Sequence, residues 1–275
     1  MISHERTCEL IEGIERFVIF GLVIGLIVIG LSVQIVSATE LRTGEIFNDC
    51  QTCPKMIVVP AGKFSMGTND GDDSERPKHI VTISKAFAVG VYEVTQAEWL
   101  SVMGSNPSEN VGDQHPVENV SWEDANEYIH KLSDRSDNEY RLLSESEWEY
   151  VARAGSSTFY YWGSSWVGGD GDCARCTMDQ SENHTYPVGS FPPNGFGLFD
   201  MYGNVWEWVQ DCWNSDYIDG PTTEAPRLAG NCTARVLRGG AWRNIPKHLR
   251  SSDRISHKTS VEHFIFGFRV AKTLP

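Results

Sequence analysis

The chain has 275 residues, of which 40% are hydrophobic and 22% are charged, and its formal net charge is −14. This composition is ordinary for a globular protein. The negative charge argues against nucleic acid as a partner, because a phosphate backbone requires a basic protein face.

The beginning of the chain differs from the rest. Arg16 is followed by an uncharged run at the lower limit of the length that spans a bilayer, and Val36-Ser-Ala38 matches a signal-cleavage pattern. Two interpretations stay open, an uncleaved membrane anchor and a signal peptide that is cut after Ala38. We divide the chain into an N-terminal tail at 1–16, a transmembrane or signal segment at 17–37, a polar linker at 38–49 and one folded domain at 50–275.

Both interpretations export the folded domain. It would belong either to a single-pass protein of the inner or plasma membrane, held there by the N-terminal helix, or to a periplasmic or secreted protein. The first part of this domain is rich in short β patterns. Strands are predicted at 56–59, 63–67, 79–83 and 87–94, each next to a turn or a polar loop.

Three helices follow, and each begins with the same capping signal. A Ser or Thr stands three residues before an acidic side chain, so that the two can satisfy backbone N–H groups of the first helical turn reciprocally. The boxes predict helices from Thr95 to Val102, from Trp122 to Leu132, and from Ser144 to about Ala154.

Regular periodicity stops after Gly155. The stretch 155–240 is rich in Gly, Pro, Trp, Asn and Asp, and we expect loops and short strands there. A strand that begins at Arg235 should end in the Gly-Gly turn, and a closing strand is predicted at 267–270.

Cysteine usage supports export independently. Cys8 precedes the membrane segment, and six cysteines follow it, which fits up to three disulfides in an oxidising compartment. We expect Cys212 to pair with Cys232. Two Cys-x-x-Cys pairs remain, and a four-cysteine zinc site is the alternative to two further disulfides. These two pairs are Cys50 with Cys53 and Cys173 with Cys176.

Several motifs after Cys50 have a distinctive order and spacing. They are Val59-Pro-Ala-Gly62, Tyr92-Glu-Val-Thr95, Arg141-Leu-Leu-Ser-Glu-Ser-Glu-Trp148, Asn194-Gly-Phe-Gly197, Gly203-Asn-Val-Trp-Glu-Trp208 and Arg238-Gly-Gly-Ala-Trp242. In these residues the chain resembles the formylglycine-generating-enzyme (sulfatase-modifying factor) family. The resemblance implies an α+β, C-type-lectin-like fold with little regular secondary structure.

The family's chemistry does not carry over residue by residue. Its namesake oxidises a cysteine of sulfatases to formylglycine with dioxygen and copper(I), which two active-site cysteines hold. The matching positions here are Asn244 and Leu249, and a serine near that site is matched by Ala241. Copper(I) needs soft thiolate ligands, which neither Asn nor Leu provides. The resemblance therefore predicts a member with no catalytic cysteine pair and no copper centre.

A calcium site is the part of the family pattern that carries over. The resemblance assigns to Ca²⁺ the side chains of Asp200 and Glu207 and the carbonyls of Gly203 and Val205, and hard oxygen ligands suit this ion. The alternative is that Asp200 caps a turn and that Glu207 pairs with an arginine. The family's second calcium site is not recognisable, and a disulfide in the same loop could cross-link it in place of the ion.

The remaining aromatic and basic residues of the motifs receive structural roles. We expect five tryptophans in the core, namely Trp122, Trp148, Trp206, Trp208 and Trp242. Arg238, Arg250 and Arg269 should form buried ion pairs with Glu145, Glu147 or Glu207. The groove that replaces the family's active site is predicted to be lined by Trp242, Arg243, Asn244, His248 and Arg250.

Two functional classes follow. The first is an exported binding module whose groove recognises a peptide, protein or glycan. The alternative is an enzyme, either a protein-modifying oxidase of the formylglycine-generating type or one that uses non-cysteine residues. The absence of Cys at 244 and 249 favours the first class, and the sequence leaves enzymatic activity open. A structural envelope protein is a third, weaker interpretation.

Overall fold

The computed structural model describes residues 41–165 and 184–274. The predicted transmembrane or signal segment lies outside these ranges, and so do Cys173 and Cys176. Among the helices of the described ranges, none combines the length and the apolar character that a bilayer span requires.

The three predicted helices are present, and all three capping boxes form. They are α1 (Gln96–Met103), α2 (Trp122–Ser136) and α3 (Glu145–Arg153), capped by Thr95, Ser121 and Ser144. The helix α1 ends at Gly104, whose φ of 80° lies in the left-handed region that glycine adopts readily. The helix α2 continues past its predicted end at Leu132 to Ser136, where Asp137 in the left-handed region ends it.

A five-stranded sheet forms one side of the fold. Its order is β1 (Ile46–Phe47), β2 (Met56–Val59), β5 (Phe87–Gly90), β11 (Val270–Thr273) and β6 (Tyr140–Leu142). Because β1 pairs with β2, the folded part begins before Cys50. The C-terminal strand β11 is inserted between β5 and β6 and is antiparallel to both.

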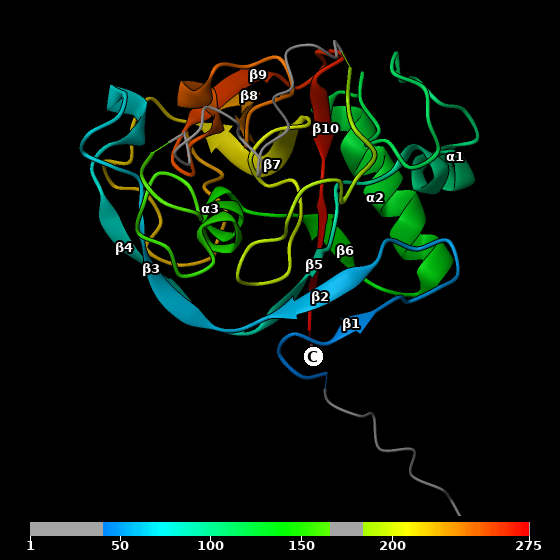
Figure 1. Cartoon of the computed structure of the whole chain (residues 1–275), viewed down its shortest axis with the longest axis horizontal. Coiled ribbons are helices and arrows are strands. Elements are labelled where there is room, and N and C mark those ends of the chain that lie inside the picture. Colours follow the sequence, from blue (N-terminus) through cyan, green and yellow to red (C-terminus); the bar gives the residue numbers. More distant parts are fainter. Residues whose placement is uncertain (1–40, 166–183, 275) are drawn as a thin grey trace, which may run out of the picture. The chain divides into compact units, whose positions relative to one another are not determined.

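A four-stranded sheet lies across the other side (Figure 1). Its order is β10 (Phe266–Phe268), β7 (Trp206–Trp213), β8 (Asn231–Arg238) and β9 (Arg254–Lys258). The predicted closing strand 267–270 is thus two strands, β10 and β11, which belong to different sheets. Arg269 lies between them, at the point where the chain crosses from one sheet to the other.

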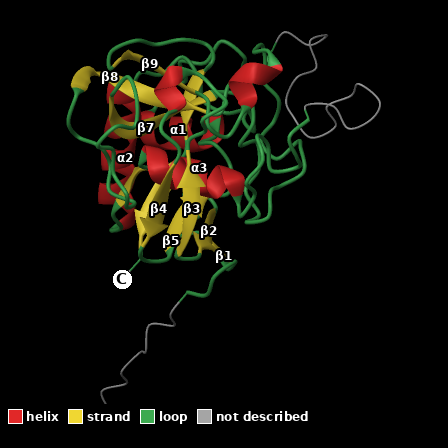
Figure 2. Cartoon of the chain, turned by 90° about the vertical axis from the view of Figure 1, so that its left-hand side faces the viewer, coloured by secondary structure: helices red, strands yellow, loops and turns green. Residues whose placement is uncertain are grey.

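The strands β3 (Gly62–Met66) and β4 (His79–Ile83) form a separate ribbon. Figure 2 shows this ribbon below α3, and the ring of Phe64 on β3 lies 5.4 Å from that of Tyr150 on α3. The strand predicted at 87–94 ends at Gly90, since the chain turns there toward α1. Two short 3-10 helices, Asp73–Glu75 and Pro246–Leu249, complete the described elements.

The tryptophans occupy the core as predicted, with one exception. Trp148, Trp206 and Trp208 are at most 1% exposed, and Trp242 is 7% exposed. Trp122 is only half-buried, and its ring stacks under the guanidinium of Arg235 at 4.2 Å.

Two of the expected disulfides are formed. Cys212 on β7 is bonded to Cys232 on β8, and Cys50 is bonded to Cys53. The second bond removes both thiols from the alternative four-cysteine zinc site. The predicted Cys173–Cys176 pair falls outside the described residues.

Candidate functional site

A pocket of about 250 Å³ opens beside the Gly-Gly turn. Its walls are mainly apolar, and its polar groups are one amide and three imidazoles. The lining residues are Trp206, Asn244, His248, Ile255, His257, His263, Ile265 and Phe266. Trp206 comes from β7, and the other lining residues come from the segment 244–266, which includes β9, the loop before β10 and the start of β10.

The turn that leads into the pocket depends on glycine. Gly240 has a φ of 76°, and a side chain there would meet the carbonyl oxygen of His248 at 2.5 Å. Beyond the turn, the backbone N–H of Ala241 donates to Oδ1 of Asn244 at 2.9 Å, and the N–H of Asn244 donates to the carbonyl of Ala241 at 2.9 Å. These two bonds fix Asn244 through its oxygen and leave its Nδ2 group available to the pocket.

His248 lies on the 3-10 helix Pro246–Leu249 and is held by a buried acid. Its Nδ1 is 3.1 Å from Oδ2 of Asp253, whose side chain is 4% exposed. The other oxygen of Asp253 lies 3.4 Å from the guanidinium of Arg250. The imidazole therefore has a fixed orientation at the edge of the pocket.

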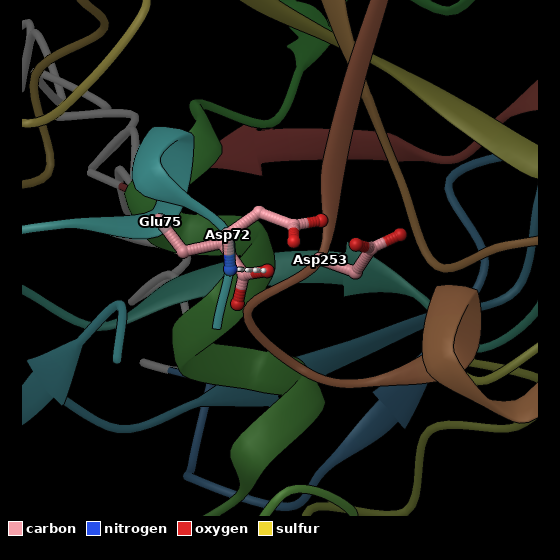
Figure 3. A group of neighbouring side chains, drawn as sticks. All are labelled: Asp72, Glu75 and Asp253. Carbon is pink, nitrogen blue, oxygen red and sulfur yellow. Dashed lines mark hydrogen bonds between the residues drawn. The ribbon is translucent and has the colours of Figure 1, made fainter. Parts of the chain in front are cut away.

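Asp253 belongs to a trio of acidic side chains, with Asp72 and Glu75, whose oxygens lie within 4.8 Å of one another (Figure 3). Each already has a basic partner: Asp72 binds Lys247 at 2.9 Å, and Glu75 binds Arg250 at 2.6 Å. Burial opposes ionisation of Glu75, yet the Arg250 guanidinium brings its pKa below the usual value. The trio therefore anchors the segment 247–253 rather than offering free ligands.

Of the five residues of the predicted groove, two line this pocket and three do not. Arg250 is buried and donates two hydrogen bonds to Glu75, 2.6 and 2.9 Å long, so it points away from the pocket. Trp242 and Arg243 lie beside the pocket without lining it, because the guanidinium of Arg243 stacks on the rings of Trp242 and Phe264. Asn244 and His248 line it as predicted.

Two pocket histidines were missed by sequence reasoning. His257 and His263 have no recognisable metal spacing, and they meet only because β9 and the loop before β10 adjoin. Burial lowers the pKa of both imidazoles, and the proximity of His263 to His257 lowers that of His257 further. The Nδ1 atom of His263 is buried with no hydrogen-bond partner.

The predicted ion pairs are confirmed for Arg269 and, at a longer distance, for Arg238, whereas the partners predicted for Arg250 are wrong. Arg269 binds Glu207 at 2.9 Å, and both are buried. Arg238 binds Glu149 and approaches Glu145 only to 3.7 Å. The remaining acids of the prediction have other partners, with Glu145 on Arg254 at 2.7 Å and Glu147 on Arg141 at 2.6 Å.

Of the residues assigned to calcium, Asp200 and Glu207 interact electrostatically, and Glu207 is already engaged by other groups. Both oxygens of Glu207 already accept hydrogen bonds, from Arg269 and, at 2.8 Å, from Nε1 of Trp148. Glu207 would have to give up one of these bonds to bind a cation. This is the arginine pairing that the alternative interpretation described.

Asp200 has an oxygen that is free for a ligand. Its Oδ2 accepts from the backbone N–H of Gly189 at 2.6 Å, but its Oδ1 is buried without a partner. The loop that follows is sharply bent, since Asp200, Gly203 and Asn204 all have positive φ values of 59°, 134° and 59°. A bent loop of this kind suits an oxygen-coordinated cation, which takes carbonyls as well as carboxylates.

Glu93 is an additional acid that the sequence did not suggest. It lies between β5 and α1, it is 1% exposed, and neither of its oxygens has a hydrogen-bond partner. Burial and the nearby charge of Asp200 raise its pKa well above the usual value, and burial raises the pKa of Asp200 to about 6. Glu93, Asp200 and Glu207 interact electrostatically, but their oxygens do not form one of the described clusters in which three acids lie within 4.8 Å of one another.

Comparison with known proteins identifies the class. Residues 42–274 match the model of the sulfatase-modifying factor enzyme 1-like domain, and the chain belongs to this family. The fold is therefore the α+β fold of formylglycine-generating-enzyme relatives.

Three similar proteins illustrate the range of the family. PvdO from Pseudomonas aeruginosa is a solved structure with a TM-score of 0.78 and 35% identity, covering 85% of this chain and 99% of that one. The formylglycine-generating enzyme of Streptomyces coelicolor is 30% identical over 78% of this chain and 88% of its own length. The serine/threonine-protein kinase Pkn1 of Chlamydia trachomatis is 30% identical over 79% of this chain, which spans only 38% of that kinase.

Proposed function

We propose that the protein is an exported ligand-binding member of this family and that it does not act by the copper oxidase reaction. The observation that carries the proposal is the nature of the two positions matched to the family's copper ligands. Asn244 presents an amide to the pocket, and Leu249 is 0% exposed within the core. No thiol lines this pocket, and copper(I) requires soft ligands.

The pocket supports binding of a small group. Apolar walls with a few fixed polar atoms are typical of ligand sites. A volume of about 250 Å³ admits a small molecule or one side chain of a peptide or protein. The polar atoms of Asn244, His257 and His263 supply the hydrogen bonds that would orient such a ligand.

A binding experiment with two simple probes tests this proposal. N-acetylphenylalanine methylamide represents a peptide side chain, and methyl glucoside represents a glycan. We expect saturation-transfer NMR to detect one of them on the full chain. The Ile255→Trp variant should remove the signal by filling the pocket, while Ile218→Trp, at a residue that is 60% exposed and outside the lining, should not. Failure of both probes, or binding undiminished in Ile255→Trp, would contradict a ligand site here.

We also propose a structural calcium ion in the carboxylate region. Glu93 and Asp200 would supply side-chain oxygens, and Gly203 and Val205 would supply carbonyls. Glu207 would either stay paired with Arg269 or give up a hydrogen bond to bind the ion. The support is three buried oxygens without hydrogen-bond partners, on two acids whose charges act on each other. Calcium should raise the melting temperature of the full chain, whereas magnesium, which requires a smaller octahedral shell, should do so less.

Export is proposed from the N-terminal segment and the disulfides together. The uncharged run at 17–37 is of the kind that anchors or exports a chain, and disulfides persist in oxidising compartments. Protease added outside intact cells, or to a periplasm opened by osmotic shock, should digest the domain. Complete protection of the domain in both treatments would contradict export.

A further inference from the structure

The pairing of His248 with Asp253 has a use beyond holding the pocket wall. A carboxylate only accepts hydrogen bonds, so Nδ1 of His248, at 3.1 Å from Asp253, carries the proton, and Nε2 is the basic nitrogen. His248 lines the pocket, and among the described residues its side chain is hydrogen-bonded through Nδ1, which leaves Nε2 available. A buried acid that orients an imidazole whose second nitrogen faces a pocket is the arrangement of a general base.

Asp253 is itself held firmly, which the arrangement requires. One of its oxygens lies 3.4 Å from Arg250, and its backbone carbonyl accepts a hydrogen bond from Arg238. Its backbone N–H donates to the carbonyl of Arg250 at 3.1 Å. The acid is thus fixed on three sides, and the base that it orients cannot turn away without breaking the contact.

Asn244 adds a fixed donor to the same pocket. Its Oδ1 is occupied by the backbone N–H of Ala241, so the side-chain amide presents Nδ2. An amide N–H that is oriented before the ligand arrives can stabilise negative charge as it develops on a carbonyl oxygen. The other two imidazoles of the pocket, His257 and His263, have no hydrogen-bonded acid among the described residues, although the charge of Glu109 acts on His263, and they do not share this role.

We propose that the pocket is a hydrolytic site for a small acyl ester or amide with an apolar acyl or leaving group. His248 Nε2 removes a proton from a water molecule while the water oxygen bonds to the carbonyl carbon. The Asn244 amide donates to the carbonyl oxygen, which carries the negative charge. The carbonyl then re-forms, the bond to the leaving oxygen or nitrogen breaks, and the proton on His248 passes to the leaving group.

This inference rests on the proposed function, since it needs the pocket to bind a ligand. His248 and Asn244 are the catalytic residues, and Asp253 is a positioning residue that acts through His248. The pocket volume of about 250 Å³ limits the substrate to a small molecule or to one modified side chain of a larger partner.

The probe for the experiment is 4-nitrophenyl acetate, whose hydrolysis by the full chain is followed as 4-nitrophenolate release. We expect His248→Gln to lower kcat/KM about a hundredfold, as for loss of a general base, and Asn244→Ala about tenfold. Asp253→Asn should lower kcat with KM unchanged. His130→Gln, which removes an exposed imidazole on α2 outside the pocket, should have no effect.

The proposal is overturned if His248→Gln and the unaltered chain release 4-nitrophenolate at the same rate. Because Asp253 also contacts Arg250, its variant is interpreted only with an unchanged melting temperature, and His248→Gln decides the question if Asp253→Asn unfolds. Binding of the uncleavable analogue 4-nitroacetophenone is measured in parallel. Binding without turnover would remove the hydrolytic role and keep the ligand pocket, whereas neither binding nor turnover would remove both.

Discussion

Two groups of buried carboxylates in this domain differ in how their negative charge is compensated. Around α3, each acid meets an arginine. Glu149 is bound by Arg153 at 2.7 Å and by Arg238, and Glu145 is bound by Arg254 at 2.7 Å. All of these residues are at most 6% exposed, so the charges are neutralised inside the protein.

The second group combines Glu93, where β5 leads into α1, with Asp200, in the loop before β7. Glu93 and Asp200 are also buried, but three of their oxygens have no hydrogen-bond partner. The nearest guanidinium, that of Arg269, is 3.9 Å from Glu93 and is already engaged by Glu207. Because an uncompensated buried charge is costly, the first group is complete in itself and the second requires a proton or a cation.

Removing an arginine from the complete group should have the largest effect. Arg238→Met leaves Glu149 buried with one partner fewer and also frees two backbone carbonyls, those of Ser251 and Asp253. We expect a loss of about 3–5 kcal/mol in the free energy of unfolding, measured in urea. A loss below about 1 kcal/mol would show that this group does not depend on its arginines.

The open group should respond to calcium instead. At 100 times its dissociation constant, calcium would stabilise the folded chain by about 2.7 kcal/mol. Glu93→Gln should abolish this gain, measured as the shift in melting temperature between calcium and chelator. Glu127→Gln, at an exposed acid on α2, is the matched control and should keep the full shift. An equal shift in Glu93→Gln and in the unaltered chain would exclude Glu93 as a ligand.

A third test measures how the stability of the chain depends on pH through Asp211, an acid at the edge of the complete group. Burial, together with the charge of Glu145, raises the pKa of Asp211 from 3.8 to about 7. The folded chain therefore keeps a proton that the unfolded chain has lost, so this residue makes stability fall as the pH rises between these values. The contribution is at most about 1.4 kcal/mol per pH unit.

The charged groups around Asp211 include Glu145, Arg254 and Arg235, and its oxygens accept from the backbone N–H groups of Glu145 and Arg227. Urea unfolding at pH 5 and pH 6 should give a smaller fall in Asp211→Asn than in the unaltered chain. An identical fall in the two proteins would mean that Asp211 is ionised throughout this range.

The smallest effect is expected at an exposed pair. Lys131 lies 2.7 Å from Glu127 on α2, and both side chains are about half exposed. Lys131→Ala should change the free energy of unfolding by less than about 1 kcal/mol, because water already solvates both charges. A loss comparable with that of Arg238→Met would remove the distinction between buried and exposed pairs.

Local signals in the sequence predicted the helices well and the sheets less well. A capping box lies within four residues, so the local sequence at each N-cap predicts the start of a helix. The three N-caps are Thr95, Ser121 and Ser144. The strand β7 was expected only as part of a stretch of loops and short strands, because its partners β8 and β10 lie far along the chain. The split between β10 and β11 depends on two different sheets and leaves no local pattern.

The candidate site was predicted in part for the same reason. Asn244 and His248 follow the Gly-Gly turn and were found by their position in the motif. The direction of Arg250 is set by Glu75, which is 175 residues away, and the sequence contains no sign of this contact. Glu93 likewise belongs to a motif beside a helix cap. That its carboxylate is buried without hydrogen-bond partners depends on the tertiary structure, and no local pattern indicates it.

The central claim is that this family member lacks the thiol-oxidising copper site, and one assay tests it most directly. The purified chain would be loaded with copper(I), aerated and mixed with a peptide that contains Cys-x-Pro-x-Arg, with the Streptomyces coelicolor formylglycine-generating enzyme as positive control. We predict that mass spectrometry finds the cysteine unchanged with this chain and converted to the aldehyde with the control. Conversion to the aldehyde by this chain would contradict the claim and show that other residues replace the cysteine pair.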